Sequence, residues 1–136
     1  NIIERGNIQV KDIQGVVEAN SFHGNIILKN IQGTAVVNVM EIGNIEAEFV
    51  NTAFDKPMMF TTFKGDISLK VPPKAKARLE LKSDFGEFFT DFPKTLLRYD
   101  PQLTASSPWN YYILNHGKSK VTLKNIEGNI YLRQKK

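Results

Sequence analysis

The chain has 136 residues, with a hydrophobic content of 41% and a charged content of 24%, values that exclude a disordered polymer. It contains no cysteine, which excludes disulfide bonds and thiolate metal sites. The 18 Lys and Arg residues outnumber the 14 Asp and Glu residues, and no apolar run approaches the roughly 20 residues that a membrane-spanning helix needs. We expect one domain over residues 1–136.

A short unit, in which a turn glycine is followed by an alternating strand, recurs along the chain. It reads GNIQV, GNIIL, GNIEA, GDISL, GEFFT and GNIYL, starting at Gly6, Gly24, Gly43, Gly65, Gly86 and Gly128. The first four intervals between these glycines are 18 to 22 residues, and the last is 42, which is two periods. A period near 20 residues, with a short strand after each turn, is typical of a stacked β-solenoid.

Within a unit, apolar residues stand at the same offsets in successive repeats. They occupy positions 2, 4, 7, 11 and 13 after both Gly6 and Gly24, and the second set is Ile26, Leu28, Ile31, Ala35 and Val37. Alternation predicts strands, and repetition at fixed offsets predicts columns of inward side chains. We predict an all-β fold, a single-stranded, β-helix-like solenoid that is right-handed and has about six rungs with two short strands each.

Bulky apolar residues also stand one or two positions before the turn glycines. They are Phe22, Ile42, Phe63, Phe85 and Ile126. We interpret these five side chains as buried plugs at the corners of the rungs.

Residues 93–117 break the period with three prolines and several aromatic residues. We predict that this segment is an irregular aromatic insertion or cap. Trp109, Tyr111 and Tyr112 are the candidate contacts to a ligand or partner, because rings on irregular segments stack on sugars and anchor partners. The alternative, which we favour, is that the segment covers the unpaired strand edges at one end of the solenoid and buries these rings.

Asn or Asp follows most of the turn glycines, at Asn7, Asn25, Asn44, Asp66 and Asn129. A ligand-binding ladder is one interpretation of this column. A structural role is favoured, because Asn tolerates turn conformations and bonds the local backbone, and because stacked Asn side chains also bond one another along the axis.

The densest basic stretch is Lys74, Lys76, Arg78 and Lys82. Spacing by two residues places these side chains on the outward face of one strand. We interpret this face as ordinarily solvated, with a polyanion-binding patch as the alternative.

Candidate catalytic and metal-binding side chains are few and scattered. His23 and His116 are far apart and lack the spacing of metal ligands. Ser106 and Ser107 are not part of a G-x-S-x-G nucleophile elbow. We expect no catalytic residue, no cofactor, no metal and no enzymatic activity.

The run FTTFKGDISLKVPPKAKARLELKSDFGEFFTDF (Phe60 to Phe92) resembles the bacterial putative-adhesin β-solenoid family, and the ending KVTLKNIEGNIYLRQ resembles that family's terminal rung. The turn before this ending reads Asn115-His116-Gly117-Lys118, where the family has an Asn-Gly-Gly-Gly-like turn. The resemblance spans nearly the whole chain and implies a secreted, periplasmic or cell-surface protein. It transfers no catalytic or ligand-binding residue, because that family has no agreed ligand.

Two main functional hypotheses follow. The first is a non-enzymatic cell-envelope or surface protein, an adhesin-like module that binds a protein or glycan partner or acts as a spacer. The second is a self-assembling β-helical scaffold, similar to polymer-forming cytoskeletal proteins, joined end to end through open strand edges. A weaker alternative is a carbohydrate-binding or carbohydrate-active protein. None of these hypotheses involves nucleic acid.

Overall fold

The computed structural model describes residues 2–4, 7–54, 56–93, 95–99 and 110–134. Within these ranges the chain forms β-strands and no helix. The strands are β1 (Ile2–Glu4), β2 (Ile8–His23), β3 (Ile26–Ile42), β4 (Ile45–Phe49), β5 (Met58–Lys64), β6 (Ile67–Val71), β7 (Ala77–Ser83), β8 (Phe88–Thr90), β9 (Leu97–Tyr99), β10 (Asn110–Leu114), β11 (Lys120–Glu127) and β12 (Ile130–Gln134).

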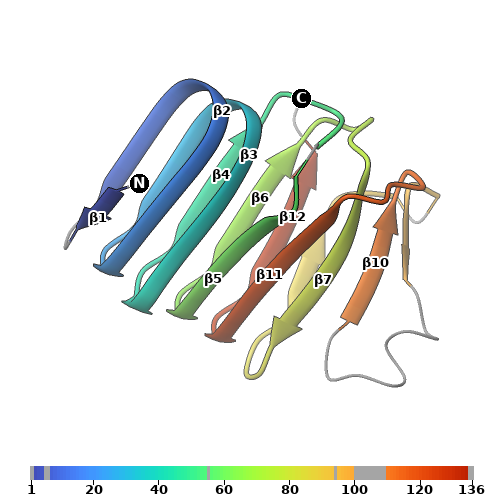
Figure 1. The fold of residues 1–136 in the computed structure, drawn as a ribbon. Coiled ribbons are helices and arrows are strands. Elements are labelled where there is room, and N and C mark those ends of the chain that lie inside the picture. The colour runs from blue at the N-terminus through green and yellow to red at the C-terminus, as the bar shows by residue number, and fades with distance from the viewer. Residues whose placement is uncertain (1, 5–6, 55, 94, 100–109, 135–136) are drawn as a thin grey trace.

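The strands form two walls, which are joined because β2 and β3 bend in the middle and continue from one wall to the other (Figure 1). The first wall holds the strands that follow a turn glycine, namely the first halves of β2 and β3, then β4, β6, β12 and β8. The second wall holds β1, the second halves of β2 and β3, then β5, β11, β7, β10 and β9. The expected all-β, solenoid-like architecture is confirmed.

The core lies between the two walls, where the predicted inward side chains are buried. The set after Gly24 is at most 1% exposed, and the pairing register places equivalent isoleucines side by side at Ile8, Ile26, Ile45, Ile67 and Ile130. Phe49 of β4 meets Phe60 of β5 across the core, with ring centroids 6.2 Å apart in an edge-to-face arrangement. Contacts of this kind hold the walls together by apolar burial and ring packing.

In the C-terminal half, the order of strands in space departs from their order in the chain. β6 lies beside β4, but β7 does not lie beside β5. Instead β11 lies between β5 and β7, and β12 lies between β6 and β8. The connection at residues 72–76 therefore leads one rung further than the equivalent connection from β4 to β5, and β11 and β12 fill the strand positions left open.

This topology corrects our interpretation of the 42-residue interval as two stacked periods. Gly128 lies between Gly65 and Gly86, because it contacts both of them. An interval in sequence counts residues along the chain, and it says nothing about a strand that returns later to fill a gap.

The turn glycines stack with their backbones in contact, and we call this column the glycine corner. A Cβ atom added to Gly43 would lie 1.9 Å from the carbonyl oxygen of Gly24, and one added to Gly128 would lie 2.1 Å from that of Gly65. Gly128 also has a φ of 132°, which L-residues rarely adopt. Glycine is required at this corner because adjacent rungs approach too closely for any side chain.

β9 and β10 extend the second wall at its C-terminal end, and both pairings of β10 are antiparallel, with β7 and with β9. Residues 93–117, expected as an irregular insertion or cap, thus contain two ordered strands and are not irregular throughout. The turn after β10 departs from extended geometry, with φ of 50° at Asn115 and 58° at His116. The Asn115 amide donates to the carbonyl oxygens of Pro73 (2.9 Å) and Ala75 (2.7 Å), which fixes the connection at residues 72–76 against this turn.

Candidate functional site

The candidate contact residues occupy different environments at the end of the second wall. Trp109 lies outside the described residues. Tyr111 and Tyr112 are neighbours on β10, both half-buried, and strand alternation points them to opposite faces. The Tyr112 ring faces the core and lies 5.0 Å from the ring of Phe88 and 5.2 Å from that of Tyr99, centroid to centroid. Burial, and secondarily the neighbouring Tyr99, raises the pKa of Tyr112 above its ordinary value.

The Asn and Asp side chains after the turn glycines form a ladder along the axis, and we call it the corner ladder. The side-chain oxygen of Asn25 accepts the backbone N–H of Asn44 at 2.8 Å, and that of Asn44 accepts the backbone N–H of Asp66 at 2.8 Å. The same bond joins Asn7 to Asn25, Asp66 to Asn129, and Asn129 to Glu87. The partners are therefore backbone groups of the next rung, and this is the structural role that we favoured.

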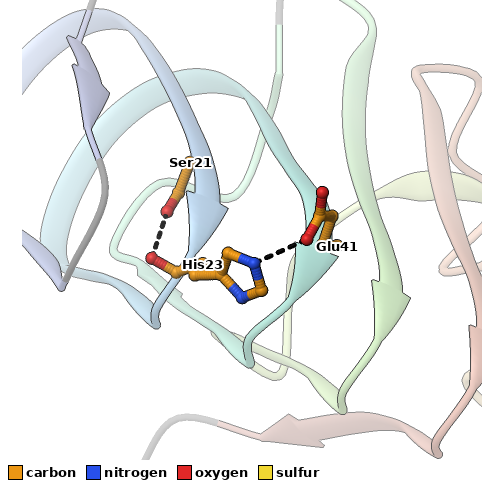
Figure 2. Close-up of polar contacts among 3 residues, drawn as sticks. All are labelled: Ser21, His23 and Glu41. Carbon is orange, nitrogen blue, oxygen red and sulfur yellow. Dashed lines mark hydrogen bonds and ion pairs between the residues drawn. The ribbon is translucent and has the colours of Figure 1, made fainter.

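His23, Ser21 and Glu41 are the residues closest to a hydrolase-like arrangement, and Figure 2 shows that they do not form one. His23 Nε2 lies 2.5 Å from a Glu41 carboxylate oxygen, and both side chains are about half exposed. The Ser21 hydroxyl instead donates to the backbone oxygen of His23, at 3.0 Å, and the Ser21 side chain is buried. A hydroxyl bonded to a carbonyl on the inner side is not activated by the imidazole.

The described residues hold no group of three or more His, Asp or Glu side chains arranged to bind a metal ion. They also contain no helix long and apolar enough to cross a membrane.

Exposed apolar side chains gather on the outer side of the second wall, next to the glycine corner, and we call this set the apolar ridge. Its members, with the exposed fraction of each, are Phe22 (38%), Met40 (52%), Ile42 (52%), Phe63 (51%), Phe85 (78%) and the half-buried Ile126. The register places Phe22 beside Met40 and Phe63 beside Ile126 in one row. Ile42 pairs with His23 and Lys64 in the next row, and the backbone N–H of Phe85 donates to the Ile126 oxygen. Our prediction that the residues before the glycines are buried plugs was wrong for this set.

The reason for this error is that small polar residues, not the bulky ones, face inward at the corner. The Thr62 hydroxyl donates to the Gly43 oxygen (2.9 Å), and the Ser83 hydroxyl donates to the Gly128 oxygen (2.9 Å). Asn125 Nδ2 donates to the Gly65 oxygen at 3.0 Å. These carbonyls need donors, which an apolar plug does not have. Strict alternation from Ala19 and Phe60, the buried residues three positions earlier, would have placed Phe22 and Phe63 outside.

A shallow depression of about 340 Å³ lies in the ridge. Its lining is mainly apolar and includes Met40, Phe63 and Ile126, with Asn38, Thr61 and Lys124 at the side. The β3 strand has an irregular register between Val39 and Ile42, where it pairs with β5. This irregularity falls beside Met40.

Comparison with known proteins places the chain in a family. A search of the curated proteins gave no match. One solved structure, a putative cell adhesion protein from Clostridium sporogenes, aligns with a TM-score of 0.44 and 8% sequence identity over 98% of this chain and 92% of that chain. The family model described as Toastrack DUF4097 matches residues 3–133. Because this match spans nearly the whole chain, the protein belongs to the Toastrack DUF4097 family.

Proposed function

We propose that this chain is a non-enzymatic module of the cell envelope or cell surface, with an adhesin-like role, and that it binds a protein partner on the apolar ridge. The observation that carries the proposal is the ridge itself. Clusters of exposed apolar side chains mark interaction sites, whereas single exposed apolar residues are ordinary. Phe22, Phe63 and Phe85 supply the aromatic area that dominates protein interfaces.

The charged rim of the ridge suits a protein partner. Lys64 and Glu127 form an ion pair of 3.4 Å beside the ridge, and His23 contacts Glu41 at its other end. Charges of both signs around an apolar centre are typical of protein interfaces, in which the polar rim sets the orientation of the partner. A lipid surface would favour a rim of cations alone.

Site-specific photo-crosslinking in intact cells tests this proposal. A photoreactive side chain in place of Phe63 is expected to form an adduct with one envelope protein. The matched control places the same group at Gln9, which is exposed on the first wall. The adduct should disappear when Phe22→Ser and Phe85→Ser are added. Equal adducts from both positions, or none from Phe63, would contradict the proposal, and an adduct with a second copy of the chain would favour self-assembly.

The self-assembling scaffold is the second candidate, and the C-terminal end weighs against it. Polymerisation through parallel rungs needs a parallel edge at both ends, whereas β10 and β9 introduce antiparallel pairing at this one. Concentration-dependent filaments in electron micrographs would revive this candidate. Hydrolysis or elimination on a panel of polysaccharides would revive the carbohydrate-active alternative.

Three finer points belong to the same proposal. We propose that the solenoid winds right-handed, since right-handed crossovers prevail between parallel strands, and that it has about six rungs. Trp109, Tyr111 and Tyr112 remain candidate contacts to a ligand. For Tyr112 the packing on Phe88 and Tyr99 supports a capping role instead. A crystal structure tests the handedness, and quenching of Trp109 fluorescence tests the exposure of that ring.

A further inference from the structure

Cationic side chains that are far apart in the chain converge on the outer side of the second wall at its C-terminal end. Arg78 on β7 pairs with Lys120 on β11, and Lys82 pairs with Lys124. Arg98 on β9 and Arg78 lie on either side of Ile113 of β10, in the same row. Strand spacings place paired cations about 5 Å apart across strands, while cations four residues apart on one strand are about 13 Å apart. The insertion of β11 beside β7 therefore turns one basic strand into a surface.

The two turns at the edge of this surface add further cations. The backbone at Lys76 lies against Gly117, and Asn115 bonds the carbonyl of Pro73, so the turn that carries Lys118 lies beside the turn that carries Lys74. We call the whole set the basic face, and it holds eight of the 18 Lys and Arg residues: Lys74, Lys76, Arg78, Lys82, Arg98, Lys118, Lys120 and Lys124.

The basic face has a composition that the first wall does not share. Glu80 is the acidic residue within its rows, whereas on the outer side of the first wall Lys29, Lys70 and Arg133 surround both Glu46 and Glu48. Like charges directly opposite one another on neighbouring strands are destabilising. The face accepts this cost at two pairs, Arg78 with Lys120 and Lys82 with Lys124, which stand on either side of the Glu80–Thr122 pair.

Glu80 and its surroundings indicate which anion fits. Its carboxylate lies 3.4 Å from Lys120 Nζ and 3.4 Å from the Thr122 hydroxyl, and the Tyr111 side chain stands beside it in the register. The Glu80 carboxylate repels any anion placed directly against it, but it accepts hydrogen bonds from hydroxyls, which a glycan carries between its charged groups and a DNA backbone does not. Cations for carboxylates, an acceptor for hydroxyls and a ring for stacking together match a polymer of acidic sugars better than a nucleic acid.

We propose that the basic face binds an acidic polysaccharide, a linear glycan that carries carboxylates on successive sugars. This inference deepens the proposed envelope function by naming a ligand class, on a surface that adjoins the apolar ridge at Lys124. Carboxylates pair with the rows of Arg78 and Lys82, and sugar hydroxyls donate to Glu80. The proposal takes up the polyanion-binding alternative for Lys74, Lys76, Arg78 and Lys82, in place of an ordinary solvated face.

Binding to polygalacturonate, measured by titration calorimetry at low salt and again near physiological ionic strength, tests the inference. The test variant neutralises three exposed cations of the basic face, Arg98→Gln, Lys118→Gln and Lys120→Gln. The matched control neutralises three exposed cations of the first wall, Lys11→Gln, Lys29→Gln and Arg133→Gln, and so has the same net charge. We expect the test variant to lose affinity roughly tenfold or more and to show a weaker salt dependence, while the control stays within about threefold.

Comparison ligands separate the alternatives. Neutral dextran is expected not to bind. Equal losses in the two triple variants would reduce the effect to net charge and overturn the inference, as would the absence of polygalacturonate binding. Tighter binding to phosphatidylglycerol vesicles or to DNA would overturn it in favour of a membrane or a nucleic acid. Melting temperatures of both triple variants near that of the parent protein exclude unfolding as the cause of a loss. The crosslink at Phe63 tests the proposed protein partner of the apolar ridge independently of glycan binding.

Discussion

The two halves of the stack share one corner but differ in connectivity. From β2 to β6, the residues joined by the corner ladder are 18 to 22 positions apart in the chain. Around β12 they are 63 and 42 positions apart. The bond length is nevertheless 2.8 Å both from Asn44 N to Asn25 and from Asn129 N to Asp66. The residue types at the turn determine the stacking, whatever order the chain follows between rungs.

The interleaved order is thermodynamically inexpensive. Lengthening a closed loop from 22 to 63 residues raises the entropic free-energy cost of closing it by only about 1 kcal/mol. Inserting β12 buries Ile130 and Leu132 to at most 1% exposure, and burying such side chains is worth roughly 1.5–3 kcal/mol each. The apolar contacts of the inserted strand therefore outweigh the cost of the longer connection.

The largest effects should come from charges placed in the core of either half. Ile26→Asp in the regular half and Leu132→Asp in the inserted strand each bury a carboxylate among apolar side chains, at an expected cost above about 4 kcal/mol. We expect both variants to lose cooperative unfolding, as followed by circular dichroism, while Gln9→Asp on the exposed side has little effect. If Leu132→Asp retained native β2–β6 signals by NMR, the inserted half would be an independent unit.

Two glycine substitutions distinguish the cost of backbone crowding from the cost of an unfavourable backbone conformation. Gly128→Ala meets both obstacles, since its Cβ would lie 2.1 Å from the Gly65 oxygen and its φ is 132°. Gly15→Ala meets only the second, with a φ of 118° and no atom within 4 Å of the new Cβ. Urea denaturation should show a loss of about 1–3 kcal/mol for Gly15→Ala and a larger loss for Gly128→Ala. Equal losses of stability in the two variants would mean that the backbone near Gly128 shifts to admit the new methyl group without a free-energy cost.

The regular half was predictable from sequence because its signals are local and repeated. The inward set after Gly24 and the glycine turns were identified from offsets alone, and the structure bears them out. The position of β11 in the sheet was not predicted, because it depends on a pairing between Leu123 and residues more than 40 positions earlier in the chain. The apolar ridge was missed because bulky residues were assumed to face inward. The inward positions are instead taken by Thr62 and Ser83, whose hydroxyls donate to carbonyl oxygens of the turn glycines.

The basic face shows the same limit at the level of the site. Arg78 and Lys82 are visible in the sequence as one alternating strand, and they were interpreted as solvated. Lys120 and Lys124 come beside them only because the last strands return into the open rung. A surface made by the topology has no signature in the local sequence.

Removing ladder acceptors should have intermediate effects that compare the two halves directly. Asn44→Ala deletes an acceptor within the regular half, at an expected cost of about 0.5–1.5 kcal/mol. Asp66→Ala deletes the acceptor that joins β6 to β12, and because a carboxylate is the stronger acceptor we expect about 1.5–3 kcal/mol. Thermal unfolding measures both, and Asp66→Asn serves as the control that keeps the acceptor. An equal loss in Asp66→Asn would show that the charge, not the bond, is responsible.

The smallest effect should appear at the end of the stack, where Tyr112 packs between the walls. Burial raises the pKa of its hydroxyl above 10.0, so the folded state holds a proton that the unfolded state releases first. Its contribution to stability is therefore complete below about pH 10 and is lost as the pH rises through the folded-state pKa. Tyr112→Phe removes this titration, so the decline of the unfolding free energy at alkaline pH should become shallower. Urea denaturation at stepped pH measures the decline, and tyrosinate absorbance identifies the late-titrating hydroxyl.

Tyr131→Phe is the control, because that ring stacks on Phe89 at the surface of the first wall. An identical pH profile for the two variants would show that Tyr112 is not buried, and the capping role of its ring would then be abandoned.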